Sequence, residues 1–171
     1  MSNTTTGLKA GLVAGILYGI VDGVFEYIIL VVFKSLVMSV LEKELATLNA
    51  ITPVKTTAQA LYNIAIVEGF ALAIIGGLIG GLILGAIFGA VYNRVPGKSS
   101  VAKGLVFGVI LWLILNVLIG LLDLSTYGSS YYLVGIGFGL IAALIWGYVA
   151  GFLFGKWKSS PPQQEELQTF P

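Results

Sequence analysis

The chain has 171 residues, of which 57% are hydrophobic and only 10% are charged, and its formal net charge is +1. Soluble domains carry about 25% charged residues, so this composition, with a mean hydropathy of +0.98, indicates a membrane protein. Cysteine and histidine are both absent, which excludes disulfides, thiolate or imidazole metal sites and catalytic Ser–His or Cys–His pairs. A net charge near zero without a basic arm argues against a nucleic-acid partner. We therefore expect no cofactor, no metal ligands and no enzymatic activity.

Four stretches exceed the ~20 apolar residues that a helix needs to cross the hydrocarbon core of a bilayer. They span about residues 8–33, 59–93, 102–122 and 131–156. These stretches predict an all-α integral membrane protein with a four-transmembrane-helix bundle. We expect one domain over residues 1–158 and a polar cytoplasmic tail over residues 159–171, where Pro, Gln, Ser and Glu dominate.

The first stretch contains two carboxylates inside an apolar segment. Its apolar run is longer than the roughly 7–15 residues of a signal peptide, and no A-x-A-like cleavage site follows it, so we expect a retained helix. Asp22 and Glu26 are four residues apart and therefore share a helix face. Gly19 and Gly23 lie on or beside that face, which predicts that the carboxylates point toward a neighbouring helix rather than toward lipid.

Residues 34–57 form more than a connector on the outer side of the membrane. Apolar residues recur there at helical spacing, at Leu36, Val37, Val40, Leu41, Leu45 and Leu48. We expect a continuation of the first helix or a short amphipathic helix at the membrane surface. It should end at Thr52-Pro53, because a proline disfavours helix at the residue before it. This segment either seals the bundle or offers a docking surface to an outer partner.

The second and third stretches carry the remaining polar groups. Glu68 lies near the outer end of the second stretch, Asn116 lies near the middle of the third, and Asp123 follows Asn116 seven residues later on the same face. Counted at 1.5 Å per residue, Asp22 and Asn116 lie roughly 18 Å from the inner boundary, and Glu26, Asp123 and Glu68 lie further out.

Small residues recur at four-residue spacing in all four stretches. Glycine costs about 1 kcal/mol relative to alanine in a water-exposed helix, whereas in a bilayer it lets helix backbones approach closely. We assign helix packing, in a glycine-zipper arrangement, to Gly11, Gly15, Gly19, Gly77, Gly81, Gly85, Gly89, Gly104, Gly108, Gly139, Gly147 and Gly151. The stripes of the second and fourth helices are expected to pack the inner half of the bundle shut.

An internal duplication is one interpretation of these stripes. Residues 11–16 align with 104–109, and residues 85–89 align with 147–151. Two tandem helical hairpins would keep the same orientation and form a parallel repeat. Chance similarity between glycine-rich apolar segments explains the alignment equally well.

Four spans place both termini on one side of the membrane. That side carries six basic residues, at Lys9, Arg94, Lys98, Lys103, Lys156 and Lys158. The other side has three lysines accompanied by Glu42 and Glu44. The positive-inside rule therefore predicts cytoplasmic termini, and we expect an integral protein of a prokaryotic plasma membrane.

The polar groups Asp22, Glu26, Glu68, Asn116 and Asp123 predict an acidic vestibule that opens to the outside above a sealed inner half. A charge near the bilayer centre costs roughly 2.5–3.5 kcal/mol on insertion scales, so each is a candidate functional residue. Three interpretations remain open. Asp22 is protonated or bonded to Asn116 while the outer carboxylates are solvated; or Asp22, Glu26 and Glu68 bind a proton or a hard cation; or the face meets a basic or polar group of another subunit.

We expect a non-catalytic small polytopic membrane protein that serves as a structural or accessory subunit. It would pack into a larger membrane complex or a homo-oligomer, so its partners are the lipid bilayer and other membrane subunits or further copies of itself. The alternative is a proton- or cation-coupled transporter, or an ion-binding protein, that uses the acidic vestibule.

Overall fold

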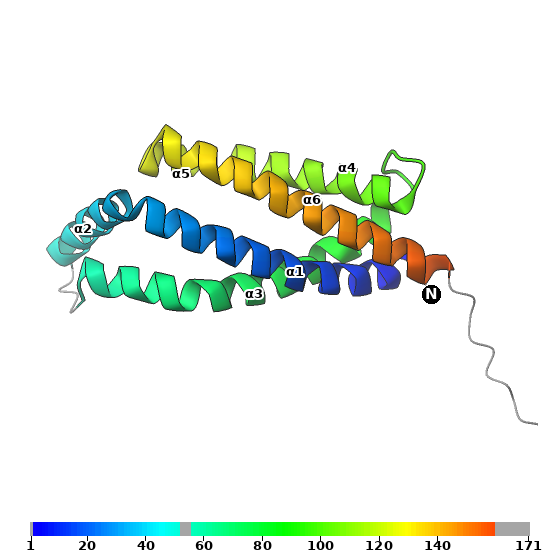
Figure 1. Cartoon of the computed structure of the whole chain (residues 1–171), viewed down its shortest axis with the longest axis horizontal. Coiled ribbons are helices and arrows are strands. Elements are labelled where there is room, and N and C mark those ends of the chain that lie inside the picture. Colours follow the sequence, from blue (N-terminus) through cyan, green and yellow to red (C-terminus); the bar gives the residue numbers. More distant parts are fainter. Residues whose placement is uncertain (1, 52–55, 160–171) are drawn as a thin grey trace, which may run out of the picture.

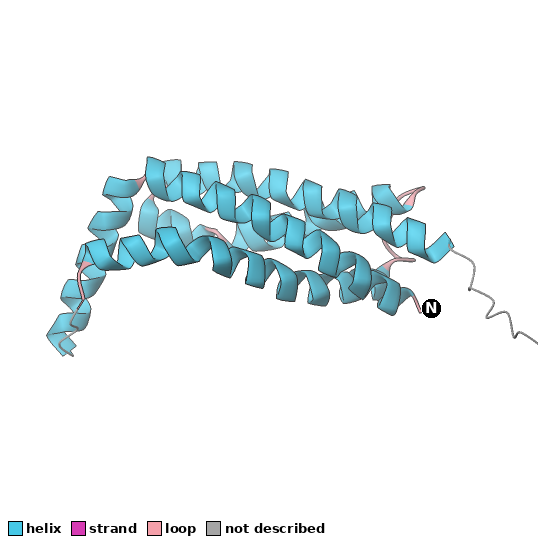
Figure 2. Cartoon of the chain, turned by 60° about the horizontal axis from the view of Figure 1, so that its bottom comes forward, coloured by secondary structure: helices cyan, strands magenta, loops and turns pink. Residues whose placement is uncertain are grey.

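The computed structural model describes residues 2–51 and 56–159, and these residues are almost entirely helical (Figures 1 and 2). The elements are α1 (Asn3–Val32), α2 (Lys34–Ile51), α3 (Ala58–Val91), α4 (Ser100–Trp112), the π-helix η1 (Leu113–Ile119), α5 (Leu121–Tyr127) and α6 (Ser129–Ser159). Four helical stretches are long and apolar enough to cross a membrane, namely α1, α3, α4 through α5, and α6. The predicted all-α fold with four membrane spans is confirmed. Of the predicted tail, residues 160–171 lie outside the described residues, and Ser159 ends α6.

Different elements lie at the two ends of the bundle. The start of α1, the connection between α3 and α4 and the end of α6 lie together at one end, called the inner end (Figure 1). The helices α2 and α5 lie at the opposite end, called the outer end. The start of α1 and the end of α6 are therefore on one side of the bundle, as four spans require.

Hydroxyl side chains set the starts of three helices. Ser2, Thr57 and Ser99 each accept a hydrogen bond from the backbone N–H three residues further on, at 3.1–3.2 Å. Such a side-chain cap stabilises a helix by about 1 kcal/mol. These caps explain why α1, α3 and α4 begin before the predicted starts at residues 8, 59 and 102.

The helices α1 and α3 pack antiparallel through facing glycines. A Cβ atom added at Gly15 would lie 2.7 Å from the Cα atom of Gly81, and one added at Gly85 would lie 2.6 Å from the Cα atom of Gly11. The same contact continues toward both ends through Gly7, Gly19, Gly77 and Gly89. The two backbones therefore touch with no side chain between them, which is how small residues bring membrane helices together.

The helices α4 and α6 form a second antiparallel pair of the same kind. A Cβ atom added at Gly104 would lie 2.8 Å from the Cα atom of Gly151, and Gly147 also contacts Gly104. The sequence did not say which helix each stripe packs against. The stripe of α3 packs on α1, and the stripe of α6 packs on α4, because each of these partners carries small residues in matching register.

The contacts relate the two hairpins in a register that differs from the sequence alignment. Gly104 meets Gly147 and Gly151, whereas in the first hairpin Gly7 meets Gly85 and Gly89. Since residues 147–151 align with 85–89, the contacts equate Gly104 with Gly7. This correspondence lies one helical turn from the predicted match with Gly11, and it places Asn116 where the first hairpin has Gly19.

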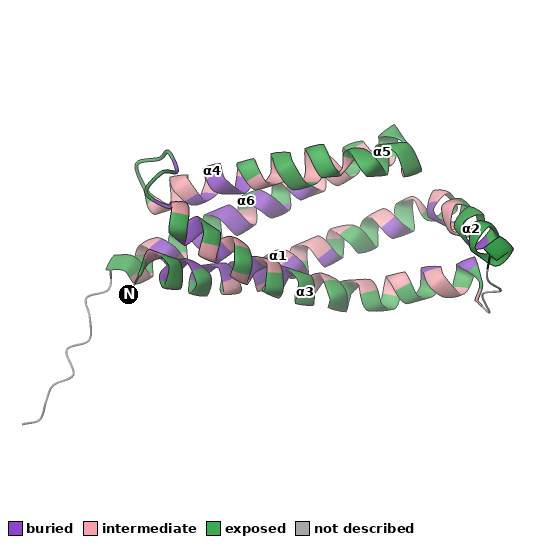
Figure 3. Cartoon of the chain, turned by 180° about the vertical axis from the view of Figure 1, so that it is seen from behind, coloured by how far each residue is buried: buried purple, intermediate pink, exposed green. Residues whose placement is uncertain are grey.

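The two hairpins are joined by α1 and α6, so the contacts link the helices in the order α3, α1, α6, α4. Ala10 and Ala14 of α1 and Ala150 of α6 are completely buried. Further out, the rings of Phe25 and Phe138 stack with their centroids 4.4 Å apart. Beyond this joint the helix axes of the hairpins diverge toward the outer end (Figure 3), where the rings of Phe33 and Tyr131 still meet with their centroids 5.5 Å apart.

Aromatic rings fill the inner half between the hairpins. We call Phe88, Tyr92, Phe107, Trp146 and Phe154 the aromatic cluster. The ring centroid of Phe88 lies 5.3 Å from that of Phe107 and 5.4 Å from that of Phe154, and both Phe88 and Phe154 are completely buried. The inner half is thus closed by side chains of α3, α4 and α6 rather than by glycine contacts alone.

The outer segment is helical, as predicted, and it bends away from α1 at Phe33. Tyr62 of α3 anchors the bend, because its hydroxyl donates to the Leu30 carbonyl oxygen at 3.1 Å and the Lys34 ammonium lies 5.2 Å from its ring centroid. Val37 is buried against this anchor. The predicted helix stop at Thr52-Pro53 lies outside the described residues.

Replacing Gly81 by alanine is expected to destabilise the bundle, whereas replacing the adjacent Gly80 is not. A Cβ atom at Gly81 would lie 2.6 Å from the Cα atom of Gly15, but one at Gly80 meets nothing within 4 Å. Forcing α1 and α3 apart should cost about 1–3 kcal/mol, while Gly80→Ala gains up to about 1 kcal/mol of helix propensity. Thermal unfolding of both variants in the same detergent measures the difference, and equal melting temperatures would contradict the α1–α3 contact.

Candidate functional site

A cavity of about 200 Å³, called the central cavity, lies between the hairpins on the outer side of the aromatic cluster. All four spans line it, for example through Tyr18 of α1, Gly76 of α3, Leu115 of η1 and Ala143 of α6. Gly76 and Leu115 are also exposed on the surface, so the cavity opens sideways between α3 and η1. Its lining is largely apolar and belongs to the four apolar spans, which places it at hydrocarbon depth.

Paired glycines in α3 create one wall of this cavity. Gly77 and Gly81 pack on the backbone of α1, whereas a Cβ atom added at Gly76 or Gly80 meets nothing within 4 Å. Neighbouring residues point about 100° apart around a helix. Gly77 and Gly81 therefore form the contact with α1. Gly76 and Gly80 form a cavity wall without side chains, across the cavity from Leu111.

The π-helix η1 shapes the wall opposite α3. The sequence predicted one continuous helix over residues 102–122, but the structure divides this stretch into α4, η1 and the start of α5. Asn116 lies within η1, and a Cβ atom added at Gly139 would lie 2.6 Å from its Cγ atom. Asn116 thus occupies the space that Gly19 leaves free in the first hairpin, and it keeps the two backbones apart there. A π-helix has a wider turn and is frequent at functional sites.

Two hydrogen bonds connect the irregular stretch and the end of α4 to α6. The Trp112 indole N–H donates to the carbonyl oxygen of Ile136 at 3.0 Å, and the Tyr132 hydroxyl donates to the carbonyl oxygen of Val117 at 2.9 Å. The second bond satisfies a carbonyl group inside the π-helix, which would otherwise be costly to leave unpaired in lipid. The Trp146 indole N–H, by contrast, is buried without a hydrogen-bond partner among the described residues, in contact with the ring of Phe107.

Asp22 lies beside the central cavity rather than in it. It follows Tyr18 by one helical turn on α1, so the two side chains lie on the same face of the helix. Tyr18 lines the cavity together with Asn116, which comes from the opposite wall. The structure therefore brings Asp22 and Asn116 to the same region, with Tyr18 between Asp22 and the cavity.

The other members of the predicted vestibule are dispersed. Asp123 shares a smaller cavity of about 100 Å³ with Asn116 near the outer end. Glu26 is exposed and lies opposite Gly69, where an added Cβ atom would be 3.9 Å from its Oε1 atom. Glu68 is exposed on α3. Within residues 2–51 and 56–159, no three acidic side chains are grouped so that they could hold a metal ion.

Residues 5–165 match the model of a protein family described as "Family of unknown function (DUF6789)", and the chain belongs to this family. The match covers all four spans, so both hairpins are part of the same family unit. No curated protein and no protein of known structure matches the chain.

Gly139→Ala is expected to lower stability by about 1–3 kcal/mol through overpacking against Asn116. Gly137→Ala is the matched control on the same helix, because a Cβ atom there meets nothing within 4 Å. In an Asn116→Ala background the added methyl group has room, so the penalty of Gly139→Ala should largely disappear. A double-mutant cycle of thermal unfolding measures this coupling, and a coupling energy near zero would show that Asn116 does not fill the space at Gly139.

Proposed function

We propose that this DUF6789-family protein is a non-catalytic membrane protein that self-associates through α3 and acts as the packing subunit of a homo-oligomer. The observation that carries the proposal is the pair Gly76 and Gly80, which lies beside the open side of the bundle without a neighbour. Exposed leucine and isoleucine are ordinary where a protein faces lipid. Gly76 and Gly80 line the central cavity where it opens toward lipid between α3 and η1, and this opening is a depression that a second helix backbone fits.

The residues beside these glycines favour a second copy of the same helix. Ile75, Ile79 and Ile83 are 52–56% exposed on α3. A β-branched side chain has one preferred rotamer in a helix, so it loses little entropy when a partner packs on it. Small residues at four-residue spacing allow two helices to cross at close range. A two-fold axis along the membrane normal would bring this face of α3 against itself.

The absence of cysteine and histidine from the chain supports a non-catalytic role. It removes the usual pairs of a nucleophile and a general base. The carboxylates of the described residues are dispersed over α1, α2, α3 and α5, and no three of them are grouped so that they could hold a metal ion.

We further propose that the inner end faces the cytoplasm of a prokaryotic plasma membrane. Arg94 and Lys98 lie in the α3–α4 connection, and Lys9, Lys156 and Lys158 lie near the ends of α1 and α6. An excess of lysine and arginine in short loops and near span ends marks the cytoplasmic side.

Gly80→Leu is expected to abolish self-association while the monomer stays folded, because the new side chain fills the depression without meeting the protein's own backbone. Gly137→Leu on α6 is the matched control, since an added Cβ atom there also meets nothing within 4 Å. Native mass spectrometry from mild detergent should show an oligomer for the wild type and the control, and a monomer for Gly80→Leu. A wild type that is stable as a lone monomer would sink the proposal.

A proton- or cation-coupled transporter is the second candidate, and the position of Asp22 favours it. This carboxyl group is half-buried within a span, one helical turn from Tyr18, which lines the central cavity together with Asn116. An ionisable group inside a span is costly and often marks an ion or proton path.

If the protein is a transporter, Asp22→Asn should abolish cation- or proton-linked flux in proteoliposomes, because the amide keeps the shape but loses the titratable group. Glu68→Gln is the control, since Glu68 is exposed and away from the cavity. Flux that is unchanged in Asp22→Asn removes Asp22 from any mechanism.

A further inference from the structure

We propose that Lys103 and Lys158 bind the phosphate group of an anionic phospholipid at the inner end of the bundle. Both side chains converge on Tyr92, which ends α3, although Lys103 lies in the first turns of α4 and Lys158 in the last turn of α6. Three helices thus contribute to one basic site, which we call the lysine platform.

The lysine platform is held rigidly. The Tyr92 ring stacks on Phe154 with the centroids 4.3 Å apart, and its hydroxyl is hydrogen-bonded to the Ser100 hydroxyl at 2.7 Å. The Lys103 ammonium donates to the backbone carbonyl oxygen of Tyr92 at 3.0 Å, at the negative end of the α3 dipole. The position of the Lys103 charge is therefore set before any ligand arrives, and the Lys158 ammonium lies beside the same Tyr92 ring.

Within residues 2–51 and 56–159, the two ammonium groups have no anionic partner. Each nitrogen lies 4.5 Å from the Tyr92 ring centroid, so the two are at most about twice that distance apart. Among the described residues, neither has a carboxylate within ion-pair distance. The described carboxylates all lie elsewhere, at Asp22, Glu26, Glu42, Glu44, Glu68 and Asp123. Two like charges held close together without a counter-ion attract an anion that can bridge them.

The position of the platform selects a lipid phosphate as that anion. The platform lies where α3 and α6 end and α4 begins, at the boundary between the apolar spans and the connecting loop. Tyr92 and Trp157 mark this depth, since tyrosine and tryptophan favour the headgroup region. Basic groups between membrane helices on the cytoplasmic side bind anionic headgroups. Each ammonium has three N–H donors, so both lysines retain donors for the two free oxygens of a phosphodiester.

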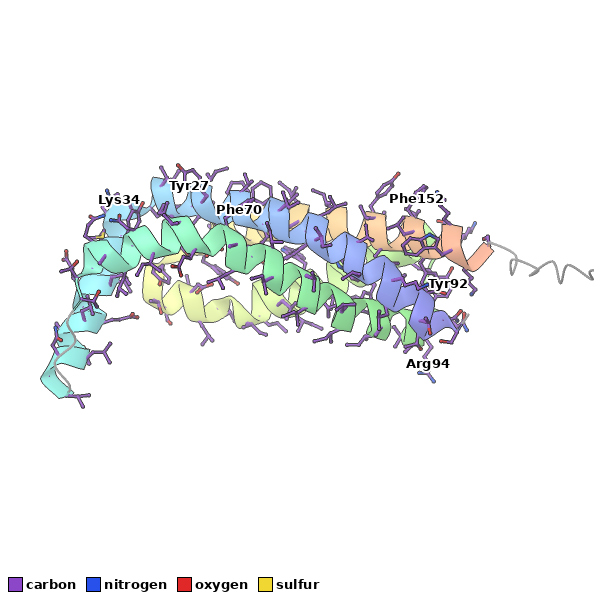
Figure 4. All side chains as sticks on the ribbon, turned by 90° about the horizontal axis from the view of Figure 1, so that it is seen from below. Tyr27, Lys34, Phe70, Tyr92, Arg94 and Phe152 are labelled. Atoms are coloured by element: carbon purple, nitrogen blue, oxygen red, sulfur yellow. The ribbon has the colours of Figure 1, made fainter. Side chains whose placement is uncertain are left out.

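Figure 4 shows that Arg94, a further basic residue, lies at the same end of the bundle as Tyr92 and at the opposite end from Lys34. Arg94 is exposed in the α3–α4 connection. It adds positive potential near the platform without being one of the groups that contact the Tyr92 ring.

Lipid retention by the purified full chain tests this proposal. The protein in mild detergent is mixed with equal amounts of phosphatidylglycerol and phosphatidylcholine, and native mass spectrometry counts the lipids that stay bound. We expect a preference for phosphatidylglycerol that falls about fivefold for each lysine replaced by glutamine in Lys103→Gln and Lys158→Gln. The double variant Lys9→Gln/Lys98→Gln, which removes the same charge from the same end, should keep the preference.

Four results would overturn the proposal. The first is that wild-type protein shows no preference for phosphatidylglycerol. The second is that the Lys9→Gln/Lys98→Gln control loses as much preference as the variants of Lys103 and Lys158, which would indicate diffuse attraction. Inorganic phosphate displaces the lipid completely, which would indicate a site for a soluble anion. A preference that emerges only after Glu165→Gln/Glu166→Gln would show that the tail carboxylates occupy the platform. Lys103 also donates a hydrogen bond to Tyr92, so the double variant Lys103→Gln/Lys158→Gln could fail to fold. In that case the single variant Lys158→Gln tests the proposal, and an unchanged preference for phosphatidylglycerol in it would overturn the proposal.

Discussion

The direct contact of antiparallel backbones is the constraint on which the rest of the structure depends. In lipid there is no hydrophobic force between helices, so association rests on close packing and on polar contacts. Where Gly15 meets Gly81 and Gly104 meets Gly147, no side chain separates the two backbones. Dispersion forces weaken steeply with distance, which makes these seams intolerant of even one methyl group. Every other packing choice in the bundle follows from two preformed hairpins.

The central cavity results from small differences between these hairpins. In α3 the glycines are doubled, and one row faces α1 while Gly76 and Gly80 are left without a neighbour. In the second hairpin, Asn116 stands where the contact register would place a glycine, and its side chain separates η1 from α6. The π-helix absorbs this separation. The cavity therefore has the side-chain-free face of α3 on one side and the displaced η1 on the other, and no side chain from either hairpin fills it.

The sequence carried enough information for the spans, the helical outer segment and the small-residue stripes, because each depends on local composition or on helical period. It did not identify which stripes pair, because a stripe of glycines shows only that some backbone approaches it. Neither η1 nor the aromatic cluster had a local signal: Phe88, Phe107 and Phe154 meet only when three helices have been placed. The polar vestibule was expected from depth and from the faces that polar residues share within one helix, but neither shows how the faces of different helices are oriented. Glu68 and Asp22 are not brought together.

The aromatic cluster bears on the proposed functions, because it closes the inner half of the bundle. A continuous path from the central cavity to the inner end would have to pass Phe88, Phe107 and Trp146, which are 0–7% exposed and in ring-to-ring contact. The side toward lipid, in contrast, is open at Gly76 and Leu115. An occupant therefore reaches the cavity most easily from within the bilayer, as a helix or a lipid chain does. Ion transport would require rearrangement of a close-packed core, whereas assembly through α3 uses the surface as it stands.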